Sequence, residues 1–205
     1  MAYALAVISL VVSTKETTAA NAIILHYSAP AFVFLLAIPM LREIPEKRDW
    51  WVLISTMLGV LCIFGQAVDG VLRGIVYGPL SGVSFALLTV FLRLNGEHNP
   101  VHTTAFNNLV VALFLLPWVW DSLWLAPREI GLMIIMGIFQ LGLPYVMYTF
   151  ALRRVIARDA ALISLLEPLL SPIWVSLFIC EVPDSMTFVG ACFIVGGLLF
   201  RFSGK

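Results

Sequence analysis

A glutamate followed by a proline stands inside an apolar run of membrane-spanning length. Glu167 and Pro168 lie in the stretch from Asp159 to Phe202. An ionisable side chain within a span is costly unless it faces a polar cavity or a partner. Pro168 removes a backbone N–H donor, which frees carbonyl groups at a similar depth. The pair predicts a site that binds a cationic group or carries a coupling proton. The alternative is a glutamate hydrogen-bonded within the bundle, where it stabilises a kink.

Other polar side chains inside apolar segments are candidates for the same site. The candidates for substrate binding, besides Glu167, are His26, Ser84, Asn108, Gln140, Tyr145 and Tyr148. Each has a structural alternative, namely a satisfied buried histidine, aromatic core packing, or hydrogen bonds between helices. Glu43 and Glu181 end their segments near the membrane interface. Together with Pro30 and Pro168, they are the candidate gating or helix-break residues; the alternative for the two glutamates is bonding to nearby backbone.

The stretch around Glu167 has an earlier counterpart from Asn21 to Phe64, at a constant offset of 138 residues. Pro30 falls on Pro168, and Glu43 falls on Glu181. The E-x-P ending and the late glycine also recur, and no gap is needed. Aligned apolar residues prove little in so apolar a chain, so the specific part is the proline and the E-x-P ending. We infer an internal repeat of a large unit.

The composition is that of an integral membrane protein. The chain has 205 residues, of which 61% are hydrophobic and 12% charged, and its mean hydropathy is +1.00. Soluble domains carry about 25% charged residues. The net charge of zero suggests no nucleic-acid partner. The three cysteines have no C-x-x-C spacing, so neither a disulfide framework nor a metal site is expected. The motifs of zinc proteases, P-loop enzymes and serine hydrolases are missing from the sequence, so no enzyme and no cofactor is expected.

Eight apolar segments alternate with short polar connections, and about 20 apolar residues are needed to cross a bilayer. The segments are Ala2–Val12, which is too short to cross alone, Asn21–Leu41, Trp50–Val68, Gly74–Leu92, Thr103–Trp120, Ile130–Leu152, Ala160–Cys180 and Met186–Phe200. We expect Asn21–Leu41 to be bent at Pro30 and Pro39. Nine of the twelve Lys and Arg residues fall on one side of this arrangement, which predicts that side, with both termini, to be cytoplasmic.

The two repeat copies are separated by an odd number of crossings, so they should run in opposite directions through the bilayer. Inverted repeats are typical of secondary transporters, whose binding site lies near the midplane. We expect an all-α bundle of inverted repeats, with residues 1–68 as a partial first unit of three helices and 69–205 as a complete second unit of five. A complete first unit would need about 67 residues ahead of Met1, so the expected parent has ten helices.

These residues resemble a known family. The run A-N-A-I-I-L-H-Y-S-A-P, followed by R-E-I-P and L-G-V-L, is similar to the fourth and fifth helices of EamA-type members of the drug/metabolite transporter superfamily. The later runs Y-T-F-A-L-R-R-V, L-L-E-P-L, C-E-V-P and G-A-C-F-I-V-G-G resemble the eighth to tenth helices. The resemblance implies ten helices in two inverted units, cytoplasmic termini, and a central cavity for small metabolites such as amino acids.

The first functional hypothesis is a secondary carrier in the cell (inner or plasma) membrane that exports small metabolites, such as amino acids or drugs, by alternating access. The second is a truncated or degenerate copy of the same fold that does not transport. An intramembrane enzyme is a third, for which no nucleophile stands out. The expected partners are a small-molecule substrate and the lipid bilayer, and a homodimer stays open.

Overall fold

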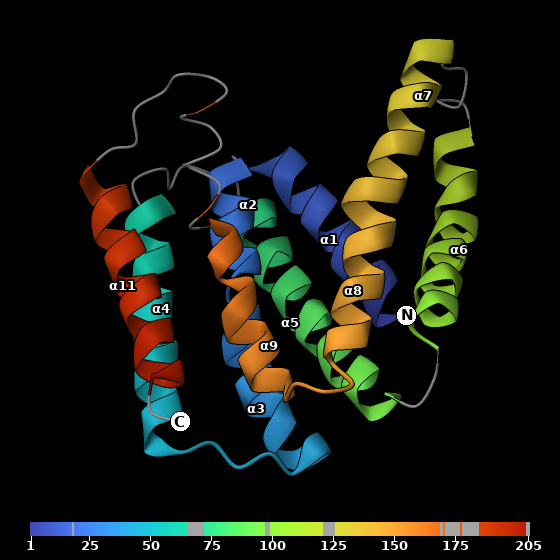
Figure 1. The fold of residues 1–205 in the computed structure, drawn as a ribbon. Coiled ribbons are helices and arrows are strands. Elements are labelled where there is room, and N and C mark those ends of the chain that lie inside the picture. Colours follow the sequence, from blue (N-terminus) through green and yellow to red (C-terminus); the bar gives the residue numbers. More distant parts are fainter. Residues whose placement is uncertain are drawn as a thin grey trace.

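Every element in the described part of the chain is a helix (Figure 1). This computed structural model describes residues 1–17, 19–64, 72–96, 99–120, 126–168, 170, 177 and 185–203. The helices are α1 (Ala2–Glu16), α2 (Ala19–His26), α3 (Ala29–Leu41), α4 (Lys47–Phe64), α5 (Leu72–Leu94), α6 (Pro100–Val119), α7 (Pro127–Met136), the π-helical η3 (Gly137–Gly142), α8 (Leu143–Ala151), α9 (Ala157–Ser164) and α11 (Ser185–Phe202).

Four stretches of the described chain are long and apolar enough to cross a membrane. They are Val76–Leu94, Pro100–Val119, Pro127–Ala151 and Ser185–Phe202. Each matches a segment predicted from the sequence within a few residues. The other predicted segments are also helical where they are described, but they are broken, short, or begin with charged residues as α4 does. The chain is therefore a multispanning helical membrane protein, as the sequence predicts.

The predicted helix at residues 130–152 contains a π-helical segment that the sequence analysis did not anticipate. Pro144 lies in the first turn of α8 and has no N–H to donate to the carbonyl of Gln140, four residues earlier. The preceding residue, Leu143, donates its N–H to Ile138, five residues earlier. This wider turn accommodates the proline without ending the span.

The two repeat copies are both interrupted four residues before their matching prolines. α2 ends at His26, and α3 begins at Ala29 with Pro30 in its first turn. α9 ends at Ser164, before Pro168. A proline ring clashes with the carbonyl of the residue four positions earlier, which explains both endpoints. The bend predicted at Pro30 is thus a complete break, whereas α3 continues through Pro39, where a bend was also expected.

The interrupted helices run in opposite directions. The end of α3 and the start of α9 lie together, because Glu43 beyond α3 accepts a hydrogen bond from the Ala157 N–H of α9 at 3.3 Å. Figure 1 shows the chain descending through α2 and α3 and ascending through α9. This is the antiparallel relation that an inverted repeat requires. We call the end of the bundle that holds Glu43 and Ala157 the arginine-rich end.

The pairing of α4 with α11 follows the symmetry of the repeat. Ser55 donates a hydrogen bond to the carbonyl of Phe193 at 2.9 Å, and these two residues are 138 apart. A Cβ added to Gly59 would lie 2.6 Å from Ile194, and one added to Gly197 would lie 3.1 Å from Thr56. The offset of 138 residues relates these two contacts, because Gly59 corresponds to Gly197 and Thr56 corresponds to Ile194. The boundaries of the two units, residues 1–68 and 69–205, remain a prediction.

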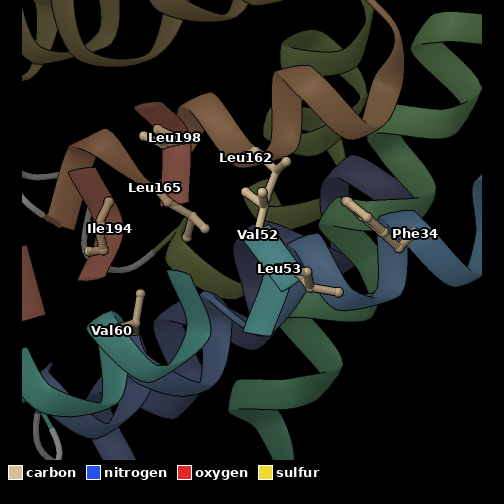
Figure 2. Packing of buried hydrophobic residues seen from close by; sticks show 8 residues of the cluster. All are labelled: Phe34, Val52, Leu53, Val60, Leu162, Leu165, Ile194 and Leu198. Atoms are coloured by element: carbon tan, nitrogen blue, oxygen red, sulfur yellow. The ribbon is translucent and has the colours of Figure 1, made fainter. Parts of the chain in front are cut away.

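A buried apolar cluster joins the two halves of the chain (Figure 2). It takes residues from α3, α4, α11, α9 and the residue that follows α9. Its members are Phe34, Val52, Leu53, Val60, Leu162, Leu165, Ile194 and Leu198. Since lipid tails are as apolar as these side chains, close packing rather than removal from water must supply their stabilisation. Small residues on α4 and α11 make that packing close.

We predict opposite effects for two glycines on α11. A Cβ at Gly190 would lie 2.5 Å from the Gly59 carbonyl oxygen, whereas one at Gly196 would meet nothing within 4 Å. Gly190→Ala should therefore destabilise the protein by about 1–3 kcal/mol through overpacking. Gly196→Ala should be neutral or stabilising, because alanine favours helix by about 1 kcal/mol. Thermal unfolding in detergent measures both, and equal effects of the two variants would contradict this packing.

Candidate functional site

Six charged side chains form a largely buried ion network at the arginine-rich end. Its members are Glu43, Asp49, Arg93, Arg158, Asp159 and Arg201. Arg158 Nη1 donates to Asp49 Oδ2 at 2.6 Å, and Arg158 Nε lies 3.5 Å from Glu43 Oε2. Arg201 bridges Asp49 and Asp159, with nitrogen–oxygen distances of 3.2 and 2.8 Å. Arg93 Nε lies 3.9 Å from Glu43 Oε1. The network therefore joins α3, α4 and α5 to α9 and α11.

Helix ends position these charges with favourable polarity. Asp49 and Asp159 lie in the first turns of α4 and α9, and Arg201 lies in the last turn of α11. Carboxylates are stabilised at the positive N-terminal end of a helix, and cations at the negative C-terminal end. The left-handed conformation of Arg42, with a φ of 56°, ends α3 and turns the chain so that Glu43 enters the network.

The network is electrically balanced, with three carboxylates and three guanidinium groups. Asp49 is only 2% exposed, and Arg158 and Asp159 are each 6% exposed. The Arg158 guanidinium also lies 5.7 Å from the centre of the Phe34 ring. Charges this buried are tolerated only when they are paired, because removing one partner leaves the other desolvated and uncompensated. The network thus ties the two halves of the chain together at this end.

Aromatic rings gather beside the two helix breaks. The His26 ring lies 6.1 Å from Tyr27 and 5.4 Å from Phe85 on α5, measured between centroids. Phe85 lies 5.9 Å from Tyr148 on α8, and Tyr145 meets Tyr3 of α1 edge to face at 5.0 Å. We call these rings, together with Glu167, the polar–aromatic group: His26, Tyr27, Phe85, Tyr145, Tyr148, Tyr3 and Glu167.

Hydrogen bonds orient several rings of the polar–aromatic group. The Tyr3 hydroxyl donates to Asn108 Oδ1 at 2.8 Å, and the Tyr148 hydroxyl lies 3.0 Å from the Thr89 hydroxyl. His26 Nδ1 lies 3.0 Å from Ser81 Oγ. Ser81 donates its single hydroxyl proton to the Gly78 carbonyl at 2.6 Å, so the His26 contact is best satisfied by an Nδ1–H that donates to Ser81.

Glu167 links the two interrupted helices. It follows the end of α9 by three residues, and its side chain is exposed while neighbouring Leu165 and Pro168 are buried. Its carboxylate accepts a hydrogen bond from Tyr27, which lies in the break between α2 and α3, and it is within electrostatic reach of Tyr145. The break in one repeat copy thus faces the break in the other through a carboxylate and a phenol.

A cavity of about 800 Å³ lies beside the polar–aromatic group and reaches it through Tyr3. The start of α1, the end of α5 and the start of α6 form its walls, and its polar lining includes Asn95, Asn99, His102 and Asn107. The walls belong to the same end of α5 that carries Arg93. The cavity is thus an open recess at the end of α5 that carries Arg93, with Tyr3 of the polar–aromatic group in its wall.

The structure brings most of the predicted site residues together. Glu167, His26, Tyr145 and Tyr148 belong to the polar–aromatic group, and Asn108 is bonded to it. Ser84 is buried on α5, and its hydroxyl has no hydrogen-bond partner within the described residues. Gln140 is exposed in η3. Pro30 and Pro168 mark the breaks, Glu43 belongs to the ion network, and Glu181 lies outside the described residues. The roles proposed for all of them stay predictions.

Sequence reasoning missed the ion network and Tyr27. Arg158 and Arg201 were used only to orient the chain, and Asp49 and Asp159 were not singled out. Partners separated by 109 residues, as Asp49 and Arg158 are, cannot be paired from one sequence. A usable signal was the presence of acidic residues among the basic ones at the same predicted end. Tyr27 could have been found from its place directly after His26 and three residues before Pro30.

The described residues hold no group of three or more His, Cys, Asp or Glu side chains that could bind a metal ion. Together, the interrupted antiparallel helices and the long apolar spans define a class, the multispanning helical membrane proteins built from inverted repeats. The family follows from the similarity of the sequence to known proteins. The EamA-like transporter family profile matches residues 1–65 and 72–203, so the chain belongs to the EamA-like transporter family, as its motifs predicted.

Several curated relatives are transporters. An uncharacterized transporter of Archaeoglobus fulgidus is 26% identical over 204 residues, which is 95% of this chain and 71% of the relative. The pseudopaline exporter CntI of Pseudomonas aeruginosa is 31% identical over 183 residues, 86% of this chain and 63% of the relative. An S-adenosylmethionine uptake transporter of Rickettsia felis is 26% identical over 184 residues, which is 88% of this chain and 62% of the relative. The chain thus spans about two thirds of the length of these relatives.

A crystal structure with 17% sequence identity has the same fold, with a TM-score of 0.84. The match covers 96% of this chain and 71% of the other. At this identity the comparison bears on the fold alone. It agrees with a helical bundle that corresponds to part of a longer architecture.

We predict that the ion network acts as one coupled unit. Arg158→Gln should destabilise the protein by about 3–5 kcal/mol, because Asp49 and Glu43 lose their buried partner. Removing a balanced pair, with Asp49→Asn and Arg158→Gln together, should cost clearly less than the sum of the two single changes. Arg128→Gln, at an exposed position, serves as the control. Thermal or denaturant unfolding in detergent gives the comparison, and strictly additive losses would contradict the coupling.

Proposed function

We propose that this chain is a secondary carrier that moves small metabolites, such as amino acids or drugs, across the cell (inner or plasma) membrane by alternating access. One observation carries the proposal: the two interrupted helices run antiparallel, and Tyr27 in one break meets Glu167 beside the other. Interrupted helices in repeats of opposite direction form the substrate sites of many carriers, near the midplane of the membrane.

The ion network supports alternating access as the mechanism. In this arrangement it holds the ends of α3, α4, α9 and α11 together, and the ion pairs of the described residues lie on this one side of the polar–aromatic group. Opening that side requires these ion pairs to separate and their charges to gain water. Glu43, which contacts both Arg93 and Arg158, has the position of a gate residue. The polar–aromatic group would then be the substrate site.

The arginine-rich end is proposed to be cytoplasmic, because most Lys and Arg residues are predicted to lie there. Both termini would then be cytoplasmic. Export is the proposed direction, since the relative named as a pseudopaline exporter is 31% identical, against 26% for the relative named for S-adenosylmethionine uptake. The alternative is a shorter copy of the fold that does not transport, which the partial coverage of the relatives keeps open.

Transport is tested with inside-out membrane vesicles from cells that express the full chain. The vesicles receive a radiolabelled amino-acid mixture, with and without an ion gradient. We expect gradient-dependent uptake that Glu167→Gln abolishes or strongly reduces, because the carboxylate at the breaks is lost. Glu16→Gln, which removes an exposed carboxylate at the end of α1, should leave uptake unchanged.

Vesicles that hold no carrier set the background of this assay, and the amount of inserted protein is measured for each variant. A correctly inserted chain with no uptake above background, for the amino-acid mixture and for a panel of drug-like dyes, would favour the non-transporting alternative. Full uptake by Glu167→Gln would remove the carboxylate from the mechanism.

A further inference from the structure

A groove runs between the start of α6 and the end of α8, two helices that lie side by side (Figure 1). Its volume is about 710 Å³. Pro100 and Val101 of α6 line one side, and Val146, Met147 and Phe150 of α8 line the other. The groove is therefore apolar along both helices.

The α8 side of this groove faces away from the polar–aromatic group. An α-helix has about 3.6 residues per turn, so Val146, Met147 and Phe150 project on the opposite side of α8 from Tyr145 and Tyr148. Met147 is 62% exposed and Phe150 is 48% exposed. Apolar side chains that a membrane span leaves uncovered meet the equally apolar lipid tails. The groove thus opens toward lipid rather than toward the candidate site.

Two arginines follow α8 at one end of the groove, which we call its mouth. Arg153 lines the groove there, and its Nε donates to the Gly96 carbonyl at 2.5 Å. The Arg154 guanidinium lies 5.1 Å from the centre of the Phe150 ring, and that ring is part of the groove wall. Both guanidinium groups are therefore held beside the apolar lining by contacts with the chain.

The mouth carries an excess of positive charge and lies at the arginine-rich end. The two connections that meet there, residues 95–99 and 152–156, hold two arginines against one glutamate, Glu97, when histidine is counted as neutral. Arg93 of the ion network donates to the Leu152 carbonyl at 2.6 Å, which ties the end of α8 to this end of the bundle. A negatively charged partner is therefore attracted to the mouth.

These features favour an anionic lipid over a second copy of the chain. In a two-fold contact both copies present the same patch, so the arginines of the two mouths would meet one another. A lipid phosphate brings the opposite charge instead, and guanidinium groups bind phosphate through several N–H donors. The acyl chain of the same lipid matches the apolar walls.

We propose that this groove binds an anionic phospholipid, with its phosphate at Arg153 and Arg154 and an acyl chain along Val146, Met147 and Phe150. The lipid would connect α6 to α8, and α6 has few residues buried in the bundle. Bound lipid should therefore stabilise the fold. The proposal concerns a face of the protein that the transport proposal does not use, so the two stand or fall separately.

The test compares phosphatidylglycerol with phosphatidylcholine carrying the same acyl chains, because only the first has a net negative headgroup. Each lipid is titrated against the purified full chain in detergent. Bound lipid is counted by native mass spectrometry, and thermal stabilisation is measured in parallel. Phosphatidylglycerol should bind about fivefold to 25-fold more tightly, since each arginine near an anionic lipid contributes about fivefold. Equal binding of the two lipids would overturn the proposal.

Variants of the arginines locate the charge effect. Arg154→Gln should lower the preference for phosphatidylglycerol about fivefold, and it leaves the bond between Arg153 and Gly96 in place. Arg153→Gln combined with Arg154→Gln should abolish the preference. Arg128→Gln, at an exposed position in the first turn of α7, is the matched control and should leave it unchanged. If the double variant does not fold, Arg154→Gln decides: a full preference in that variant, or an equal loss in Arg128→Gln, would contradict the site.

A second pair of variants tests the apolar wall. Phe150→Ala removes a ring that lines the groove, so it should weaken the binding of both lipids several fold. Phe139→Ala removes a ring that is 65% exposed in η3 and does not line the groove, so lipid binding should be unchanged. The same effect of both variants would mean that lipid binds the whole surface of the span rather than this groove.

The same measurements distinguish the other possible occupants. Inorganic phosphate at the same concentration should not stabilise the protein comparably, because it has no chain to fill the groove. Stabilisation equal to that by phosphatidylglycerol would make the mouth a site for free anions and overturn the lipid. A two-chain species that Phe150→Ala removes, together with no bound phosphatidylglycerol, would assign the groove to a second copy instead.

Discussion

The structure depends on how two prolines interrupt the backbone of membrane-spanning helices. Each removes a hydrogen-bond donor where lipid offers no water to replace it. The freed groups must then face protein rather than lipid. At the first break, the Ser28 hydroxyl donates to the Leu25 carbonyl at 2.5 Å. At the second, Glu167 meets Tyr27 from the first break. This requirement draws α2, α3 and α9 together, and α1, α5 and α8 surround them with aromatic side chains.

Charged side chains occur in two different settings along the axis of the bundle. At the arginine-rich end, six charges balance and lock α3, α4, α9 and α11 through buried ion pairs. Beside the two helix breaks, the Glu167 carboxylate meets the Tyr27 phenol. A balanced network of ion pairs holds the helices in place and can separate as a unit.

Much of the fold follows from the sequence, because apolar segments, the 138-residue offset and the distribution of Lys and Arg are local or periodic signals. Pro30 and Pro168 marked the breaks, and the role predicted for Glu167 stays a prediction. The π-helical turn before Pro144 was missed, because the pattern of apolar residues does not show whether a backbone N–H bonds four or five residues back. The ion network was missed because its partners are brought together only by packing. Gln140, chosen for its polarity inside an apolar segment, is exposed in η3, because polarity alone does not fix the face of a helix.

The central claim is that the ion network closes one end of a polar site. Ser164, between the network and Glu167, reports on this when it is replaced by cysteine in a chain whose Cys62, Cys180 and Cys192 are replaced by serine. A membrane-impermeant maleimide applied from the arginine-rich side should label it slowly while the network is intact. Labelling should become much faster when Asp49→Asn and Arg158→Gln are introduced together. Rapid labelling from that side with the network intact, or no change on its removal, would contradict the account.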